Sequence, residues 1–104
     1  MSPTARLGIL ATLQAQPGKE EQLAALIAGA RTAVEQEAGT LSWYAFRISF
    51  DTFGIFDTFA DNEGRDAHLA GAVAQALTDV ADELLATPPR IEPGDVLAVK
   101  RATP

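Results

Sequence analysis

The sequence predicts an α+β domain in which two β-α-β halves share one antiparallel sheet. Two observations lead to this prediction. Apolar residues recur at period two in some segments and at the helical period of 3.6 in others, and the segments follow one another as strand, helix, strand, strand, helix, strand. A chain of 104 residues, 47% apolar and 21% charged, is large enough for one hydrophobic core. We therefore expect residues 1–104 to form a single domain of the ferredoxin-like type.

The first half of the chain is predicted to be a strand followed by a helix. Residues 6–16 alternate between apolar and polar side chains, which is typical of a half-buried strand. Pro17-Gly18 ends this strand, and from Lys19 the apolar residues take helical spacing. The predicted buried stripe of the helix is Leu23, Leu26, Ile27, Ala30 and Val34. Gly39 is a natural end for this helix.

A hairpin is predicted to follow. Residues 41–50 and 53–60 are rich in aromatic and β-branched side chains, which favour strands. Because only Asp51-Thr52 separates them, we expect the two strands to pair directly.

The second half ends with helix and strand. Asp61 or Asn62 is expected to cap a short helix over 63–70, and Gly71 interrupts it. A second helical stretch runs to about residue 86, before Pro88-Pro89. Its predicted buried stripe is Val73, Leu77, Val80 and Leu84. The last strand is predicted over about 95–101.

Both faces of the predicted sheet carry apolar side chains. If Phe50 pairs with Phe53 across the hairpin, one face holds Tyr44, Phe46, Ile48, Phe50, Phe53, Ile55 and Phe59. The other face then holds Leu41, Trp43, Ala45, Phe56 and Ala60. A one-residue slip would exchange the two sets. Since the helices of such a fold cover only one face, we expect the second face to be covered by another copy of the chain, in a homodimer.

Composition excludes several classes of function. There is no cysteine and only one histidine, so disulfides, thiolate metal sites and histidine clusters are not expected. The net charge of −6, with 14 acidic and 8 basic residues, argues against binding nucleic acid or anionic membranes. No apolar run is long enough for a signal peptide or a membrane span, so we expect a cytoplasmic protein. The alanine-rich composition is typical of bacterial proteins.

Two side chains stand out as candidate catalytic residues. His68 is the one side chain that titrates near neutral pH without assistance, and it is either a proton acceptor at a cavity or a surface histidine bonded to backbone. Asp57 lies among Phe53, Ile55 and Phe59 on an otherwise apolar strand face. A carboxylate in that setting suits a general base or an internal ion pair.

Other residues are candidates for binding a substrate. Arg47 is a lone cation in an apolar strand, predicted to face away from Asp57; it would hold an anionic group or extend to the sheet edge. Trp43 and Tyr44 would line a pocket for a flat molecule and donate hydrogen bonds, or pack in the core or the dimer interface. Phe56 is a further candidate for the pocket wall.

These motifs together resemble the antibiotic biosynthesis monooxygenase family of dimeric α/β-barrel proteins. The similarity rests on the helix start PGKEEQL at 17–23, on the strand with Ile55-Phe56, Asp57 and Phe59, and on the pair His68-Leu69. It covers nearly the whole chain, although each motif is short. Many relatives have a second histidine where this chain has Ala72-Val73, so a two-histidine relay is not expected. Haem-degrading members carry a histidine near the position of Leu77-Thr78, so haem degradation is not expected either.

The resemblance implies oxygenation of a phenolic, quinol or polyketide-like ring by dioxygen without a cofactor. Removal of a hydroxyl proton gives an anion that reduces dioxygen itself, and the protein supplies an apolar pocket, a base and donors. His68 would be the base or a hydrogen-bond partner, and Asp57 or Arg47 would tune the site. Two alternatives are a non-catalytic ligand-binding dimer and a structural dimer whose cavity is filled by Trp43, Tyr44 and Phe46. A cyclase or isomerase on this scaffold is a further alternative.

Overall fold

The computed structural model describes residues 4–101. The elements follow the predicted order. The strands are β1 (Leu7–Gln14), β2 (Thr40–Arg47), β3 (Thr52–Phe59) and β4 (Arg90–Asp95). The helices are α1 (Glu20–Gly29), α2 (Arg31–Val34), α3 (Asn62–Leu69) and α4 (Ala72–Leu84).

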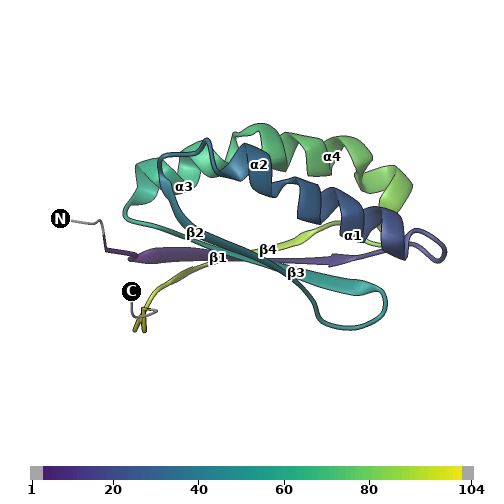
Figure 1. The fold of residues 1–104 in the computed structure, drawn as a ribbon, viewed down its shortest axis with the longest axis horizontal. Coiled ribbons are helices and arrows are strands. Elements are labelled where there is room, and N and C mark those ends of the chain that lie inside the picture. The colour runs from purple at the N-terminus through teal and green to yellow at the C-terminus, as the bar shows by residue number, and fades with distance from the viewer. Residues whose placement is uncertain (1–3, 102–104) are drawn as a thin grey trace.

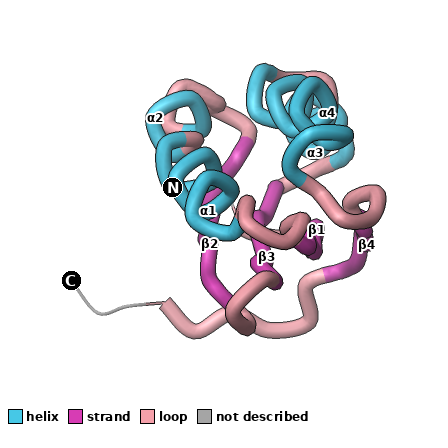
Figure 2. Tube along the Cα trace, turned by 90° about the vertical axis from the view of Figure 1, so that its right-hand side faces the viewer, coloured by secondary structure: helices cyan, strands magenta, loops and turns pink. Residues whose placement is uncertain are grey.

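The four strands form one antiparallel sheet in the order β2-β3-β1-β4. The helices form two pairs, α1 with α2 and α3 with α4, that lie side by side over the same face of this sheet (Figures 1 and 2). This arrangement confirms the α+β, ferredoxin-like prediction. No helix among residues 4–101 is long and apolar enough to cross a bilayer.

The core fills the space between the sheet and the helices. Leu13 and Leu23 are completely buried, and Phe53, Ile55 and Leu84 pack around them. These residues come from alternate strand positions and from one face of each long helix, as the periodicity predicts. Two helical predictions need correction. The first helix is divided by a turn at Ala30 and ends at Val34, before the predicted end at Gly39, and α4 ends at Leu84, before residue 86.

The hairpin register differs from the predicted one by three residues, because Phe53 pairs with Arg47 and not with Phe50. Arg47 lies opposite Phe53, and residues 48–51 form a longer connection than expected, closed by a hydrogen bond from Ile48 N to Thr52 O of 2.8 Å. Trp43 and Ala45 therefore share the helix-covered face with Asp57. Tyr44, Phe46 and Phe56 lie on the opposite face, and all three are exposed.

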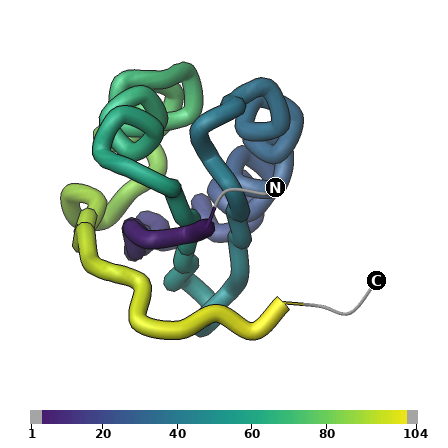
Figure 3. The backbone as a smooth tube through the Cα atoms, turned by 90° about the vertical axis from the view of Figure 1, so that its left-hand side faces the viewer, coloured from purple at the N-terminus to yellow at the C-terminus, as the bar shows by residue number. Residues whose placement is uncertain are grey.

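The last strand also differs from the prediction. β4 spans Arg90–Asp95 and pairs with β1 at the edge of the sheet, where Pro93 is tolerated because one side of the strand needs no ladder hydrogen bonds. The β-prone segment 96–101 leaves the sheet instead and runs below its open face, opposite the helices (Figure 3). Leu97 in this segment is 97% exposed.

Candidate functional site

Asp57 and Trp43 face each other across the two strands of the hairpin. They are paired Cα positions of β3 and β2, on the face that the helices cover. Asp57 is only 2% exposed, although its neighbours on that face, Ile55 and Phe59, are apolar core residues. A carboxylate loses most of its hydration in such a place and needs a compensating partner.

His68 is the partner of Asp57. It lies in the last turn of α3, a helix that starts where Asp61 accepts a hydrogen bond from Gly64 N at 2.9 Å, as predicted for the cap. The buried imidazole places Nε2 2.9 Å from Asp57 Oδ2, and its ring centroid lies 5.4 Å from that of Phe59. The structure therefore brings the two predicted catalytic candidates together. His68 is not the surface histidine bonded to backbone that was one of the two alternatives, because its ring is buried and paired with Asp57.

A second carboxylate contacts the other nitrogen of His68. Glu37, in the connection between α2 and β2, has its Oε1 2.5 Å from His68 Nδ1. A carboxylate only accepts, and an imidazole can donate from both nitrogens only as the cation. Burial by itself lowers the pKa of His68, but the hydrogen bonds to Asp57 and Glu37 outweigh it and raise the pKa from 6.5 to about 9. His68 is therefore an imidazolium at neutral pH.

A cavity of about 320 Å³ lies beside this pair, between the sheet and helices α3 and α4. Its polar lining comes from Trp43, Asp57, His68 and Thr78. Its apolar wall includes Ile9, Ile55, Val73, Leu77 and Ile91. The cavity is therefore not filled by Trp43, Tyr44 and Phe46, as the structural-dimer alternative requires. An apolar cavity with a few convergent polar groups is typical of a small-molecule site.

Two buried polar atoms in the lining residues have no hydrogen-bond partner within the described part of the chain: Trp43 Nε1 and Asp57 Oδ1. The indole nitrogen only donates and the carboxylate oxygen only accepts. Leaving such groups unpaired costs about 1–3 kcal/mol each, so folded proteins contain few of them, and a catalytic role is one of the reasons for which they occur.

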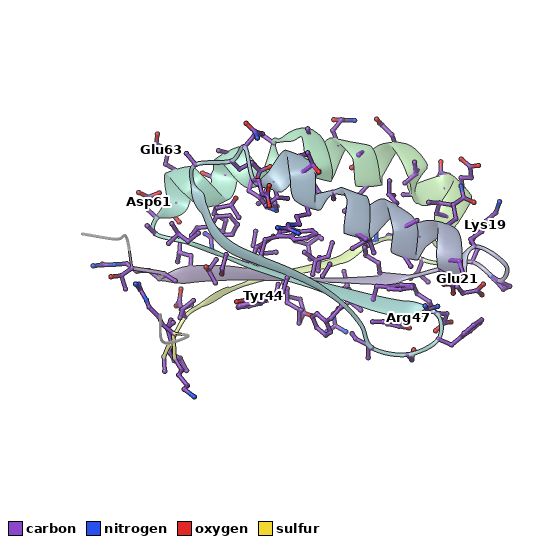
Figure 4. All side chains as sticks on the ribbon, in the orientation of Figure 1. Lys19, Glu21, Tyr44, Arg47, Asp61 and Glu63 are labelled. Carbon is purple, nitrogen blue, oxygen red and sulfur yellow. The ribbon has the colours of Figure 1, made fainter. Side chains whose placement is uncertain are left out.

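The remaining predicted site residues lie elsewhere. Tyr44 and Phe56 are on the open face of the sheet, so neither contributes to this cavity; Figure 4 shows Tyr44 pointing away from the helices. Arg47 is on the same face as Asp57, contrary to prediction, but at the far end of β2. There it pairs with Glu21 of α1 at 2.7 Å and donates to Phe50 O.

Sequence reasoning did not identify Glu37. It stands in the polar run Glu35-Gln36-Glu37, which reads as an ordinary solvated helix end. Only the approach of α3 in the folded chain distinguishes it from its neighbour Glu35, which forms an exposed pair with Arg31 at 2.8 Å. Among residues 4–101, no three His, Cys, Asp or Glu side chains are grouped so as to hold a metal ion.

Comparisons with known proteins agree with this fold. No family model and no curated protein matches the chain. The crystal structure of NE2512 from Nitrosomonas europaea, a protein of unknown function, is 41% identical, covers 99% of this chain and 100% of its own, and has a TM-score of 0.93. PA3566 from Pseudomonas aeruginosa shares the fold at 21% identity (94% and 100% covered, TM-score 0.78). So does a candidate antibiotic biosynthesis monooxygenase from Caulobacter crescentus, at 21% identity (90% and 92% covered, TM-score 0.77).

Proposed function

This chain belongs to the same protein family as NE2512 of Nitrosomonas europaea, and we propose that it is a cofactor-independent monooxygenase acting on a phenolic, quinol or polyketide-like aromatic molecule. The observation that carries the proposal is the buried Asp57–His68 pair on the wall of an apolar cavity. The fold shared with the Caulobacter crescentus protein, which is described as a candidate monooxygenase, supports the reaction class.

Asp57 is the base in this proposal, and His68 is its cationic partner. Both nitrogens of His68 already face carboxylates, so the imidazolium has no free lone pair to accept a proton. Asp57 Oδ2 faces His68, whereas Oδ1 has no partner. Of the roles that the sequence left open, the proposal takes His68 as the hydrogen-bond partner and Asp57 as the general base.

A hydroxyl group matches the two unpaired atoms. Its hydrogen would be donated to Asp57 Oδ1, and its oxygen would accept from Trp43 Nε1. The same indole N–H would then stabilise the negative charge that develops on the oxygen when the proton moves to Asp57. A flat ring bearing that hydroxyl would lie against Ile55, Val73 and Leu77.

The chemistry balances without an external reductant. For an anthrone-like substrate in its enol form, loss of the hydroxyl proton to Asp57 gives an electron-rich anion. The anion transfers electrons to dioxygen and forms a carbon–oxygen bond at the ring carbon opposite the hydroxyl. Asp57 returns its proton to the resulting peroxide anion, and loss of water from the hydroperoxide leaves a carbonyl: CH₂ and O₂ become C=O and H₂O. The substrate supplies all the electrons, and the protein supplies the base and the donor.

The proposed functional unit is a homodimer in which a second copy covers the open face of the sheet. That face exposes Tyr44, Phe46 and Phe56, with 64% of Tyr44 accessible, and the extended segment 96–101 runs below the same face. Contiguous exposed apolar patches of this kind mark interaction surfaces. An isologous pair of sheets would bury both patches at once, because each copy presents the same surface to the other.

Oxygen uptake tests the proposed activity. Purified, metal-free protein is given a panel of anthrone-like phenols and quinols, and dioxygen consumption is measured above the autoxidation blank. We expect uptake by the wild type, a loss of at least 100-fold in Asp57→Asn, and unchanged uptake in Asp51→Asn, whose carboxylate bonds Gln14 at the hairpin. Binding of these molecules without uptake would instead identify a ligand-binding protein. Equal rates in wild type and Asp57→Asn would refute the role of Asp57.

A further inference from the structure

Glu37 is a half-buried residue held in the site by several contacts. Its side chain is 19% exposed, and besides His68 Nδ1 its Oε1 accepts a hydrogen bond of 2.8 Å from Thr40 Oγ1. The backbone holds it on both sides, since Glu37 N donates to Val34 O and Glu37 O accepts from Thr40 N. A carboxylate held by this many contacts is fixed in orientation.

Three glycines allow the contact between Glu37 and His68. A Cβ on Gly39 would lie 2.8 Å from Gly64 Cα, and one on Gly64 would lie 2.8 Å from Gly39 O. The backbones of α3 and of the segment after Glu37 therefore touch directly, which brings α3 close enough for His68 to meet Glu37. A Cβ on Gly71 would lie 3.2 Å from Glu37 Oε2.

We propose that Glu37 is a positioning residue of this site, which acts through His68 to fix the orientation and the charge state of the Asp57–His68 pair. The effect of Glu37 on catalysis rests on the proposed function, but its effect on the charge and orientation of His68 depends only on Glu37, His68 and Asp57. With Glu37 as acceptor, His68 keeps a proton on Nδ1 and still donates from Nε2 to Asp57.

The electrostatic consequence distinguishes this role from simple packing. The charged groups that act on His68 within residues 4–101 are Asp57 from β3 and Glu37 from the α2–β2 connection. Burial lowers the pKa of His68, and Asp57 and Glu37 raise it. Neutralising Glu37 removes one of these two partners, so the pKa of His68 falls. A neutral His68 no longer provides the positive charge that offsets the desolvation of Asp57.

The test is an NMR titration of the His68 ring, which is unambiguous because the chain has one histidine. We expect the wild type to titrate near pH 9, Glu37→Gln to titrate at least one pH unit lower, and Glu37→Asp, which keeps the charge, to recover part of the difference. Glu35→Gln, two residues away and exposed, is the matched control and should match the wild type.

Two outcomes would overturn the inference: a wild-type pKa near 6.5, or a Glu37→Gln variant that titrates like the wild type. A purely structural role would lower the melting temperature of Glu37→Gln without moving the titration. The measurement needs no substrate, so it separates the inference from the activity. If Asp57→Asn keeps the oxygen uptake of the wild type while Glu37→Gln lowers the pKa of His68, the positioning role stands and the proposed reaction fails. If Glu37→Gln does not fold, the pKa of His68 measured in the wild type and in Glu37→Asp tests the inference instead.

Discussion

The buried imidazolium makes the stability of the protein depend on pH in a defined direction. The pKa of His68 is about 9 in the folded chain, against 6.5 for the free side chain. Below pH 6.5 both the folded and unfolded states hold the proton, so the charged His68 makes its full contribution to the free energy of unfolding. As the pH rises from 6.5 to 9, only the folded state holds it, and the free energy of unfolding falls. Above pH 9 the contribution is gone.

The size of this loss follows from the two pKa values. At about 1.36 kcal/mol per unit, a rise from 6.5 to about 9 corresponds to about 3 kcal/mol. Solvent near Glu37, which is 19% exposed, screens part of this interaction. We therefore expect a loss of about 2 kcal/mol, a substantial fraction of the 5–15 kcal/mol typical of a domain.

Urea unfolding followed by the fluorescence of Trp43, the single tryptophan, measures this loss at pH 6, 7.5 and 9.5. The matched control is His68→Gln, which lacks the titrating group. We expect the wild type to lose about 2 kcal/mol between pH 6 and 9.5 and the variant to lose less than about 0.5 kcal/mol. If the free energy of unfolding fell equally with pH in the two proteins, the buried imidazolium would be refuted.

Three further predictions concern other parts of the fold. Gly64→Ala should destabilise the protein by about 1–3 kcal/mol in urea unfolding, because its Cβ would meet Gly39 O at 2.8 Å; Gly29→Ala, with open space around its Cβ, should not. Arg47→Ala should leave the midpoint of urea unfolding close to that of the wild type and leave oxygen uptake unchanged, since its pair with Glu21 is exposed and remote from the cavity. Tyr44→Asp should shift the mass measured by light scattering from dimer to monomer; an unchanged mass would argue against a sheet-to-sheet dimer.

The order of elements was predictable because strand and helix periods differ clearly along this chain. The hairpin register was not, for a physical reason. Both faces of β2 and β3 carry apolar residues, so the pattern does not favour the observed register over the predicted one. The position of β4 was missed because Pro93-Gly94 reads as a loop, while residues 96–101 have strand composition but leave the sheet.

The candidate site was predictable where a residue conflicts with its surroundings. Asp57 was identified because a carboxylate does not belong on an apolar strand face, and His68 because it is the single histidine. Glu37 produces no such conflict, since a glutamate near a helix end is ordinary. Its role depends on the contact between Gly39 and Gly64, which joins distant parts of the chain.

The central claim is that Asp57 removes a substrate proton so that dioxygen reacts directly with the anion. Labelling with ¹⁸O₂ tests it most directly: metal-free protein and an anthrone-like phenol are incubated under ¹⁸O₂, and the product is analysed by mass spectrometry. The account predicts one labelled oxygen atom per product, formed by the wild type and only at the uncatalysed rate by Asp57→Asn. Product without label, or labelled product formed equally fast by Asp57→Asn, would contradict it.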